Sequence, residues 1–496
     1  MEKKREIVNR RKFIGVTTTA FAGITLLPCN VIAGFGQKLP SDKLNIAGIG
    51  VGGRGFSNLK CLESENIIGL CDVDWKYSQP AFDYFPKAKR YKDWRVMYDE
   101  LGKSIDGIVI ATSDHTHAII AAHAITMGKH VYLQKPLTHT VYESRLLTKL
   151  AKKYKVATSM GNQGSSEDDL SKTVEWLYNG EIGEVTKVEA FTDRPIWPQG
   201  LSRPKVEMQV PDTLNWDLFI GPAKKRPYNS IYTPWNWRGW WDFGTGALGD
   251  MACHILHPVF IGLNLKYPIS TEGSSTLLLN ECAPHAQIVK ISFPKREKPV
   301  RMKMELPDLD VIWYDGGLKP LKPKGWPAGK EMNNGGGGVI FHGNKDTLVC
   351  GSKGREPFLL SGRLPIVPEF RRRIKETHEM DWVRACKESP GNRIPTASDF
   401  SEAGPFNEMV LMGVLAVRLQ SLNKELEWDG QNMEFTNIGD SETIKTVIKD
   451  GFEIKEGHPT FNNDWTNPVN AKEFTNELIK HTYRDPWTLP QMPAKK

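Results

Sequence analysis

The sequence predicts an α/β protein, in which an N-terminal doubly wound parallel sheet precedes an α+β domain with an open, mostly antiparallel sheet. Three observations support this fold class. Short apolar runs alternate with helical patterns between residues 44 and 160, which is typical of a parallel sheet. A glycine-rich turn at residues 50–55 follows the first run. Farther along, residues 287–293 and 300–305 alternate apolar with polar side chains, which indicates strands with one exposed face.

Five apolar runs are the expected strands of the parallel sheet. They are rich in β-branched residues and alternate little, as expected when helices cover both faces of a sheet. The helix between the last two runs is well marked, because Thr140 and Glu143 have the spacing of a capping box and an i+4 apolar stripe runs from Tyr142 to Tyr154. The runs are Leu44–Ile49, Ile67–Cys71, Gly107–Ala111, His130–Leu133 and Ala157–Met160.

The second half of the chain is less regular. A strand is expected at Val185–Phe191, followed by a loop-rich stretch that holds six tryptophans between Trp197 and Trp241. Glycine, proline and lysine dominate Asp315–Gly338, which predicts a long surface loop. Phe406–Leu419 is apolar almost all round, as in a buried helix. The polar sequence after Asp440 predicts an extended arm.

The first 33 residues have the features of a twin-arginine export signal. Asn9-Arg10-Arg11-Lys12-Phe13-Ile14 carries the arginine pair, and Val31-Ile32-Ala33 offers a small-residue cleavage site. The apolar stretch Gly15–Pro28 is 14 residues long, whereas a membrane-spanning helix needs about 20. We therefore expect a periplasmic protein with no membrane-spanning segment after processing. The alternative is a disordered basic N-terminus.

Charge and cysteine content narrow the class of protein further. The net charge is +7, of which residues 1–33 contribute +4, so the remainder carries about +3. A nucleic-acid-binding protein would usually be more basic or carry a basic stripe, so we exclude that class. The seven cysteines form no CxxC pair and have no zinc-finger spacing, and we expect free buried thiols.

The turn Gly50-Val51-Gly52-Gly53-Arg54-Gly55 fits the G-x-G-x-x-G fingerprint of a Rossmann domain that binds a dinucleotide. It follows a strand, and Asp72 ends the next strand 22 residues after Gly50. Glycines allow close approach of the pyrophosphate, and Asp72 would accept hydrogen bonds from the adenosine ribose, which favours NAD over NADP. Asp72 could instead be an exposed acid in a loop. The predicted cofactor-binding residues of this turn and strand are Gly50, Gly52, Gly53, Arg54, Gly55 and Asp72.

Four further motifs occur in order: Ala111-Thr112-Ser113-Asp114-His115-Thr116-His117, Gln134-Lys135-Pro136, Gly161-Asn162-Gln163-Gly164 and Asp250-Met251-Ala252-Cys253-His254. Together they resemble the Gfo/Idh/MocA family of oxidoreductases, from Leu44 to about Leu419. The stretch Trp237–Asp242 and the pair Tyr483-Arg484 resemble a secreted branch of that family.

The resemblance implies further contacts with the cofactor. Two positions depart from the family pattern, with Gln134 in place of a glutamate and Ser113 in place of a proline. His117 could equally cap its own helix. The implied cofactor-binding residues are Thr112, Ser113, Asp114, His117, Gln134, Lys135, Pro136, Asn162 and Gln163. The predicted domains are a signal at 1–33, a Rossmann NAD(P)-binding domain at 43–164, a substrate-binding domain at 165–440 and a C-terminal arm at 441–496.

The resemblance also implies three catalytic residues, Lys135, Asp250 and His254. His254 would accept the proton of a substrate hydroxyl, Asp250 would orient His254 or bind substrate, and Lys135 would stabilise the developing alkoxide. Asp250 and His254 are four residues apart and share a face if the segment is helical. With His257 they could instead bind a metal, but no further ligand cluster supports this, and we predict no metal site. Lys135 could also be a solvated lysine before a turn, and His254 a structural histidine.

Aromatic residues just before this segment are candidates for substrate binding. Aromatic rings stack on the apolar faces of sugars, and arginine donates to hydroxyls or carboxylates. We predict contacts from Trp237, Arg238 and Trp240. Packing of these tryptophans in the core is the alternative, and we expect the cluster to divide between the two roles.

The leading hypothesis is an exported oxidoreductase that transfers hydride between a sugar or glycoside hydroxyl, C3 being one specific case, and a tightly bound NAD, with NADP as the less favoured cofactor. The first alternative is an NAD-dependent glycosidase, because α-N-acetylgalactosaminidases of this superfamily use transient oxidation and elimination. The second alternative is a non-catalytic sugar-binding protein. We also expect a homo-oligomer.

Overall fold

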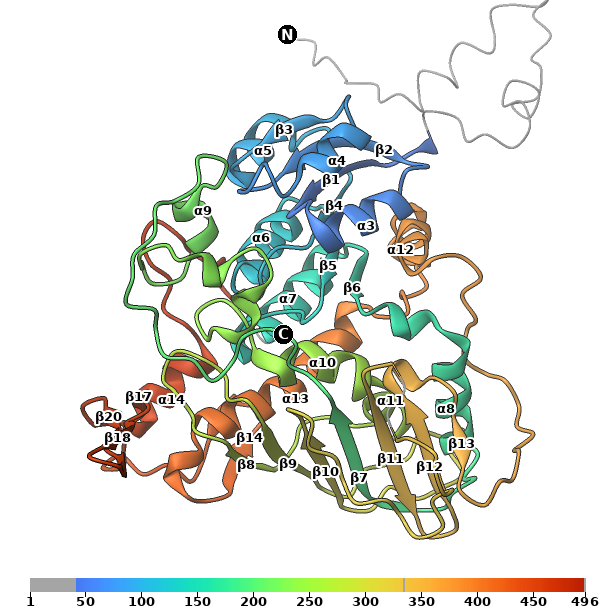
Figure 1. The fold of residues 1–496 in the computed structure, drawn as a ribbon. Helices are drawn as coiled ribbons and strands as arrows, with labels where there is room; N and C mark the ends of the chain where they lie inside the picture. Colours follow the sequence, from blue (N-terminus) through green and yellow to red (C-terminus); the bar gives the residue numbers. More distant parts are fainter. Residues whose placement is uncertain (1–41, 333–334, 495–496) are drawn as a thin grey trace, which may run out of the picture. The chain divides into compact units, whose positions relative to one another are not determined.

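The computed structural model describes residues 42–332 and 335–494. The predicted export signal at residues 1–33 lies outside the described residues. One compact unit begins at Leu44, and its described part contains a six-stranded and a nine-stranded sheet (Figure 1).

The six-stranded sheet is entirely parallel and has the strand order β3-β2-β1-β4-β5-β6, which is the order of a Rossmann domain. This confirms the predicted parallel sheet. The edge strand β3 was not predicted, because three residues are too few to form a recognisable apolar run. The strands are β1 (Asn45–Ile49), β2 (Asn66–Cys71), β3 (Lys89–Tyr91), β4 (Gly107–Ile110), β5 (His130–Gln134) and β6 (Thr158–Gly161).

Helices cover both faces of this sheet, and one of them comes from far along the chain. The helices between the strands are α3 (Gly53–Cys61), α4 (Gln79–Tyr84), α5 (Trp94–Leu101), α6 (Asp114–Thr126) and α7 (Val141–Tyr154). The capping box of α7 is present as predicted, with Thr140 and Glu143 bonded reciprocally. Helix α12 (His378–Lys387) joins α3 and α4 on one face, where Trp382 is fully buried beside Tyr132.

The nine-stranded sheet is mixed and mostly antiparallel, as predicted, and its one parallel pair in the described residues is β7–β10. Its order is β13-β12-β11-β7-β10-β9-β8-β14-β15. The strands are β7 (Val185–Thr192), β8 (Ser270–Ser275), β9 (Gln287–Phe293), β10 (Leu309–Tyr314), β11 (Gly337–Gly343), β12 (Thr347–Gly351), β13 (Phe358–Leu359), β14 (Leu426–Asp429) and β15 (Glu434–Phe435).

The strand predicted at residues 300–305 is wrong. Met302 and Met304 are buried and their neighbours exposed, so the alternation is real. These residues nevertheless lie in a turn and in irregular chain, and an isolated bridge between Arg296 and Leu306 is the ladder pairing found beside them in the described chain. Alternating burial therefore occurs here without a neighbouring strand to pair with.

One long helix lies between the two sheets. Helix α13 (Phe400–Arg418) packs against α7 on one side and against β8 and β9 on the other (Figure 1). It is buried as predicted but begins six residues earlier, because the side chain of Asp399 caps its first turn. Three other helices accompany the second sheet, namely α8 (Asp168–Tyr178), α10 (Gly246–Ile255) and α11 (His257–Gly262), and the short α9 (Trp216–Ile220) lies in the tryptophan-rich loop.

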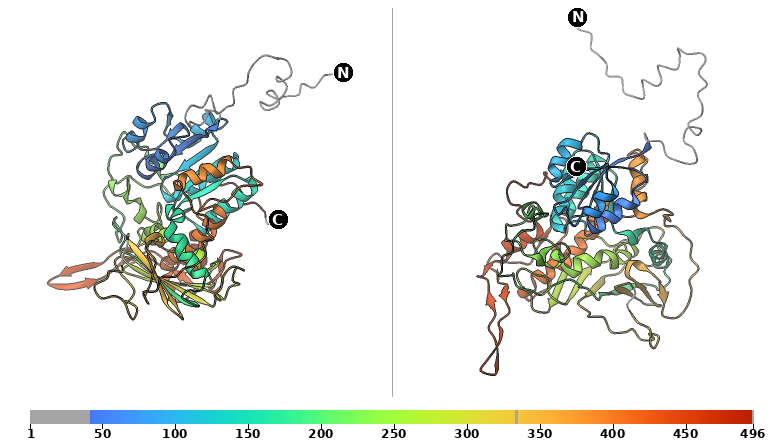
Figure 2. Two further views of the ribbon diagram at one scale, coloured as in Figure 1. Left: turned by 90° about the vertical axis from the view of Figure 1, so that its right-hand side faces the viewer. Right: turned by 45° about the horizontal axis from the view of Figure 1, so that its top comes forward.

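The segment after Asp440 is more ordered than the predicted extended arm. It forms helix α14 (Ala471–Ile479) and three two-stranded sheets, one of which is the hairpin of β18 (Phe452–Lys455) and β19 (His458–Phe461) that projects outward in Figure 2. The last residues then return toward α9, where Arg484 Nε donates to the carbonyl of Gly221 at 2.6 Å.

Two smaller expectations concern the thiols and the membrane. All six cysteines of the described chain are free, but Cys61 is exposed whereas the other five are buried, which corrects the prediction for that one. Over residues 42–332 and 335–494, no helix combines the length and apolarity needed to cross a membrane.

Candidate active site

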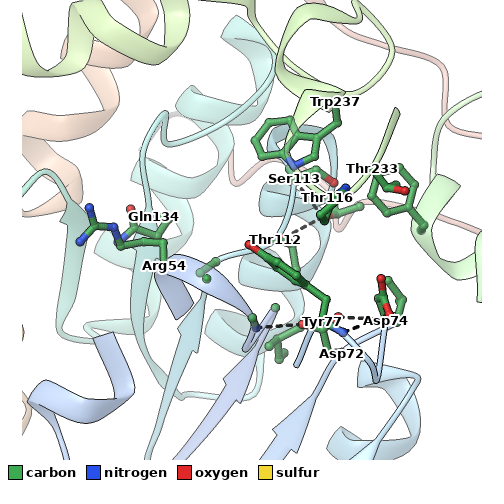
Figure 3. Close-up of a pocket in the computed structure, with 18 of the residues that line it drawn as sticks. Arg54, Asp72, Asp74, Tyr77, Thr112, Ser113, Thr116, Gln134, Thr233 and Trp237 are labelled. Atoms are coloured by element: carbon green, nitrogen blue, oxygen red, sulfur yellow. Dashed lines mark hydrogen bonds between the residues drawn. The ribbon is translucent and has the colours of Figure 1, made fainter. Parts of the chain in front are cut away.

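A cavity of about 590 Å³ lies at the carboxyl ends of β1, β2, β4 and β5. In an open α/β sheet this edge is where ligands bind. The segment 214–238 and helix α10 close the cavity, and Figure 3 shows Thr233 and Trp237 facing residues at the strand ends. The predicted site residues that line it are Gly50, Gly52, Gly53, Arg54, Asp72, Thr112, Ser113, Gln134, Lys135, Trp237, Arg238, Asp250 and His254.

The glycine turn has the backbone geometry that a dinucleotide needs. Gly50 has a φ of +74°, and a Cβ there would lie 2.7 Å from the backbone of Ala111. A Cβ on Gly55 would lie 1.9 Å from the carbonyl oxygen of Gly50, so Gly55 allows α3 to pack against the turn and does not itself line the cavity. Gly52 is the N-cap of α3, which aims the helix N-terminus at the cavity. These residues fit the pyrophosphate of a dinucleotide.

Asp72 lies beside this turn and is held by backbone donors. Its Oδ2 accepts from Gly52 N–H at 3.2 Å and its Oδ1 from Asp74 N–H at 2.9 Å. Burial raises the pKa of Asp72, although these N–H groups act against that shift. A second carboxylate, Asp74, also lines the cavity. Two acids after β2 suit the ribose hydroxyls of NAD better than the 2′-phosphate of NADP.

Tyr77 covers the glycine turn and was not among the predicted residues. A Cβ on Gly52 would lie 2.3 Å from its ring, and a Cβ on Gly53 would lie 2.5 Å from its hydroxyl. The side chain is 40% exposed and therefore has room to turn aside. Nothing in its local sequence marks it, because the contact depends on how the loop after β2 folds back.

Lys135 and Asp250 meet in the cavity as an ion pair. Lys135 Nζ donates to Asp250 Oδ1 at 2.8 Å and to the Asp250 carbonyl at 2.9 Å. Arg238 Nε donates to the same carboxylate at 3.2 Å. Burial acts to raise the pKa of Asp250, but the two cations outweigh it and lower that pKa to about 2. Asp250 therefore stays ionised and positions the two cations.

His254 lies one helical turn beyond Asp250 on α10, but its hydrogen-bond partner is Asn162. Asn162 Nδ2 donates to the carbonyl of Cys253 at 2.7 Å, which turns its Oδ1 toward His254 Nδ1 at 2.9 Å. An amide oxygen can only accept, so Nδ1 of His254 carries the proton and Nε2 has a free lone pair. Burial, and then the charge of Lys135, hold the pKa of His254 well below its ordinary value of 6.5, so the imidazole is neutral at neutral pH.

Asn162 was predicted to contact the cofactor, and the structure corrects this. Both polar atoms of its amide are used by Cys253 and His254, and it does not line the cavity. It is a positioning residue for His254, the role that sequence reasoning gave to Asp250. Gln163 also lies off the cavity, where its amide donates to the hydroxyl of Tyr132 at 3.2 Å.

Three other predicted cofactor contacts act indirectly. His117 is fully buried, and its two ring nitrogens face the carbonyls of Pro136 at 2.9 Å and Thr112 at 3.1 Å, so it ties two strand-end loops together. Pro136 lies behind Lys135 and does not line the cavity. Asp114 is buried and does not line the cavity, and its Oδ2 accepts a hydrogen bond from Thr245 Oγ1 at 2.9 Å. Burial, followed by the charge of Asp250, raises the pKa of Asp114 to about 7.

The tryptophan cluster divides between cavity and core, but not as predicted. The guanidinium of Arg238 stacks on Trp235 at 3.9 Å and on Trp237 at 4.3 Å, and all three line the cavity. Trp240 is fully buried and packs edge-on against Tyr232, so its predicted contact with substrate is wrong. Its position in the sequence, three residues after Trp237, gave no sign of which way it would turn.

Sequence reasoning also missed residues that reach the cavity from a distance. Trp487 comes from the returning C-terminus and stacks under Arg95 at 4.4 Å, beside Trp94.

As for a metal, no set of three or more His, Cys, Asp or Glu side chains in the described part of the chain is grouped to bind one. His257 instead contacts Ser165 and Glu402.

The parallel sheet and the glycine turn define a class, the dinucleotide-binding Rossmann proteins, and Lys135 lines the same cavity as His254 of α10. Residues 43–162 match the family model described as oxidoreductase family, NAD-binding Rossmann fold, and residues 177–276 match the model of the family's C-terminal alpha/beta domain. Both matches are to domains of the Gfo/Idh/MocA oxidoreductase family, and the N-terminal sheet is an NAD-binding Rossmann domain.

Known relatives are similar over part of this chain. A glycosyl hydrolase family 109 protein of Shewanella pealeana is 27% identical over 208 residues, which are 37% of this chain and 45% of that protein. An inositol 2-dehydrogenase of Salmonella typhimurium is 25% identical over 142 residues, which are 27% of this chain and 42% of that protein. The chain thus spans less than half the length of these curated relatives.

Among solved structures, the WlbA dehydrogenase from Bordetella pertussis, in complex with NADH and UDP-GlcNAcA, has the same fold. The TM-score is 0.52 with 14% sequence identity, over 78% of this chain and 99% of that one. At this identity the similarity concerns the fold alone.

Proposed function

We propose that the protein transfers hydride between a hydroxyl-bearing carbon of a sugar or glycoside and bound NAD. The observation that carries this proposal is the meeting of Lys135 and His254 in the cavity that holds the glycine turn. The named activities of the inositol dehydrogenase and glycosyl hydrolase relatives support a carbohydrate as substrate.

The side chains can manage the proton of such a reaction. His254 Nε2, with its free lone pair, accepts the hydroxyl proton. Lys135 has three N–H donors, of which two go to Asp250, and the third stabilises the oxygen as it gains charge. When bound, NAD⁺ supplies the acceptor for the hydride. Trp235, Trp237 and the Arg238 guanidinium that stacks on them line the cavity, so aromatic and hydrogen-bond-donating groups suited to a sugar lie together there.

The test is to mix the NAD-loaded protein with a panel of sugars and glycosides and to follow the absorbance of reduced nicotinamide. We expect it to rise and a keto sugar to form, with the keto position identifying the oxidised carbon, C3 being our proposal. Lys135→Met should retain NAD but form neither product. A wild-type protein that binds sugars and NAD yet never reduces NAD on any of them would favour the non-catalytic alternative.

An NAD-dependent glycosidase is the second candidate, favoured by the similarity to the glycosyl hydrolase family 109 protein. Transient oxidation at C3 would serve that reaction as well. The aglycone would be eliminated across C1 and C2, water would add at C1, and the C3 carbonyl would then be reduced again, which gives net hydrolysis. Release of the aglycone without net formation of reduced nicotinamide would support this candidate over the dehydrogenase.

Asn162→Leu is expected to leave NAD binding unchanged and to lower turnover roughly five- to tenfold, the effect of one lost hydrogen bond on the placement of His254. Asn162→Asp keeps an acceptor but adds negative charge, which should raise the pKa of His254. The acidic limb of the pH profile should then move to higher pH. Identical pH profiles for the wild type and Asn162→Asp would show that this amide does not position the base.

We also propose export by the twin-arginine route, supported by the motif at residues 9–14. Changing both Arg10 and Arg11 to Lys should leave the precursor in the cytoplasm. Fractionation of cells carrying a tagged protein measures this. Periplasmic accumulation of the double variant at the wild-type level would contradict the proposal.

A homo-oligomer is proposed as well. Its support is the projecting hairpin, on which Phe452, Ile454 and Phe461 share one face and are 53%, 68% and 70% exposed. Apolar faces of this kind are usually covered by a partner. The mass of the purified protein in solution tests this, and a monomer at micromolar concentration would refute it.

A further inference from the structure

A second cavity, of about 180 Å³, lies between the end of α13, helix α14 and the returning C-terminus. It shares no lining residue with the dinucleotide cavity in the described chain. Its walls include Trp241, which is one residue beyond Trp240, and its chemistry is set by the charged and imidazole side chains around it. No part of the proposed reaction uses these side chains.

The central feature of this cavity is Arg418, the last residue of α13. Its guanidinium lies over the ring of Trp241 at 5.2 Å and near that of Phe474 at 5.8 Å. Within residues 42–332 and 335–494, no carboxylate or carbonyl accepts a hydrogen bond from it. Burial lowers the pKa of Arg418 to about 10, so it remains charged at neutral pH. The C-terminal end of a helix favours a cation. The five N–H donors of the Arg418 guanidinium nevertheless have no acceptor among the described residues.

Two further donors surround the guanidinium. His481 lies edge-on to His139 at 4.9 Å, and its ring makes no hydrogen bond within the described residues. Burial, followed by the charge of Arg418, lowers the pKa of His481 to about 3, so the ring is neutral and offers one N–H. Lys224 is exposed and lines the same cavity.

The acidic side chains that line this cavity are already committed to other donors. Glu143 accepts two backbone N–H groups at the start of α7. Asp242 is ion-paired with Arg226. Glu477 accepts the N–H of Thr482 at 3.0 Å and its hydroxyl at 2.8 Å. None of them accepts a hydrogen bond from the guanidinium, although Asp242, Glu477 and the nearby Glu281 attract it electrostatically. Arg418 is partly buried, and its fork has no hydrogen-bond acceptor among the described residues.

We propose that this second cavity binds a small oxyanion, a carboxylate or a phosphate, between Arg418, His481 and Lys224. Planar bidentate recognition of such groups is what a guanidinium fork does best. The rings of Trp241 and Phe474 hold the fork in place, so little side-chain entropy is lost on binding. The inference stands on these residues and does not depend on the proposed sugar chemistry.

Calorimetric titration of the full chain with inorganic phosphate, and separately with acetate, tests this site. Saturating NAD is present, so that phosphate cannot occupy the glycine turn. We expect one anion to bind, and the one that binds assigns the ligand as phosphate-like or carboxylate-like. Arg418→Gln should weaken it roughly ten- to hundredfold, the usual effect of losing charge-assisted hydrogen bonds.

Arg301→Gln is the matched control, because Arg301 is exposed and also stacks on a ring, that of Phe370 at 5.0 Å, and its affinity for the anion should be unchanged. Failure of the wild type to bind either anion, or unchanged affinity in a folded Arg418→Gln, would overturn the proposal. If Arg418→Gln does not fold, the exposed Lys224→Gln decides. Weakened binding in that variant supports the site, and unchanged binding overturns it.

Discussion

His254→Ala is expected to lower turnover by about 10²–10⁴-fold on a verified substrate, because general-base assistance contributes that much to rate. Affinity for NAD should stay near that of the wild type, because the glycine turn and Asp72 lie on other elements. Steady-state kinetics and NAD titration measure the two effects. His458→Ala, which changes an exposed histidine of the hairpin, is the matched control and should keep full activity.

The pH dependence gives the same prediction a second readout. The pKa of His254 lies below 6.5, and only the neutral imidazole can accept a proton. Turnover should therefore be constant near neutral pH and fall only on acidification below that value. A near-normal rate in His254→Ala, or a rate that falls as the pH drops from 8 to about 7, would remove His254 from the mechanism.

Gly52→Val is expected to abolish measurable NAD binding, because its side chain would occupy the space through which the pyrophosphate approaches the N-terminus of α3. Asp72→Ala should weaken NAD roughly ten- to hundredfold through the loss of hydrogen bonds to a carboxylate. Fluorescence titration with NAD measures both. Each variant must first be shown to be folded by circular dichroism.

The neighbouring Tyr77 provides the control for Gly52→Val. Its ring lies 2.3 Å from a Cβ at Gly52, so the valine must displace it. If displacement of the tyrosine were the whole effect, combining Gly52→Val with Tyr77→Ala would restore NAD binding. We expect the double variant to remain inactive in binding and Tyr77→Ala alone to bind NAD. NAD affinity unchanged in both Gly52→Val and Asp72→Ala would contradict the Rossmann site.

The parts of the site that could be predicted from sequence are those fixed by short-range geometry. The glycine turn follows its strand directly, and Asp250 and His254 share a helical face through their spacing alone. Lys135 follows β5, so the parallel sheet itself carries it to the ligand edge.

The parts that could not be predicted depend on contacts between distant segments. Trp487 reaches the cavity because the C-terminus returns to α9, and α12 completes the cover of the first sheet from more than two hundred residues away. The role of Asn162 follows from two hydrogen bonds to α10, which no local pattern reveals. Trp240 and Trp237 are both buried, and only packing decides that Trp237 also lines the cavity whereas Trp240 does not.

The most direct measurement is a single turnover with a sugar or glycoside deuterated at the carbon that is oxidised. If hydride passes between the sugar and bound NAD, the nicotinamide of the recovered cofactor will carry one deuterium in the wild type, and almost none in His254→Ala or Lys135→Met over the same time. Deuterium released to water, while NAD is bound and a keto sugar forms, would contradict hydride transfer in this cavity.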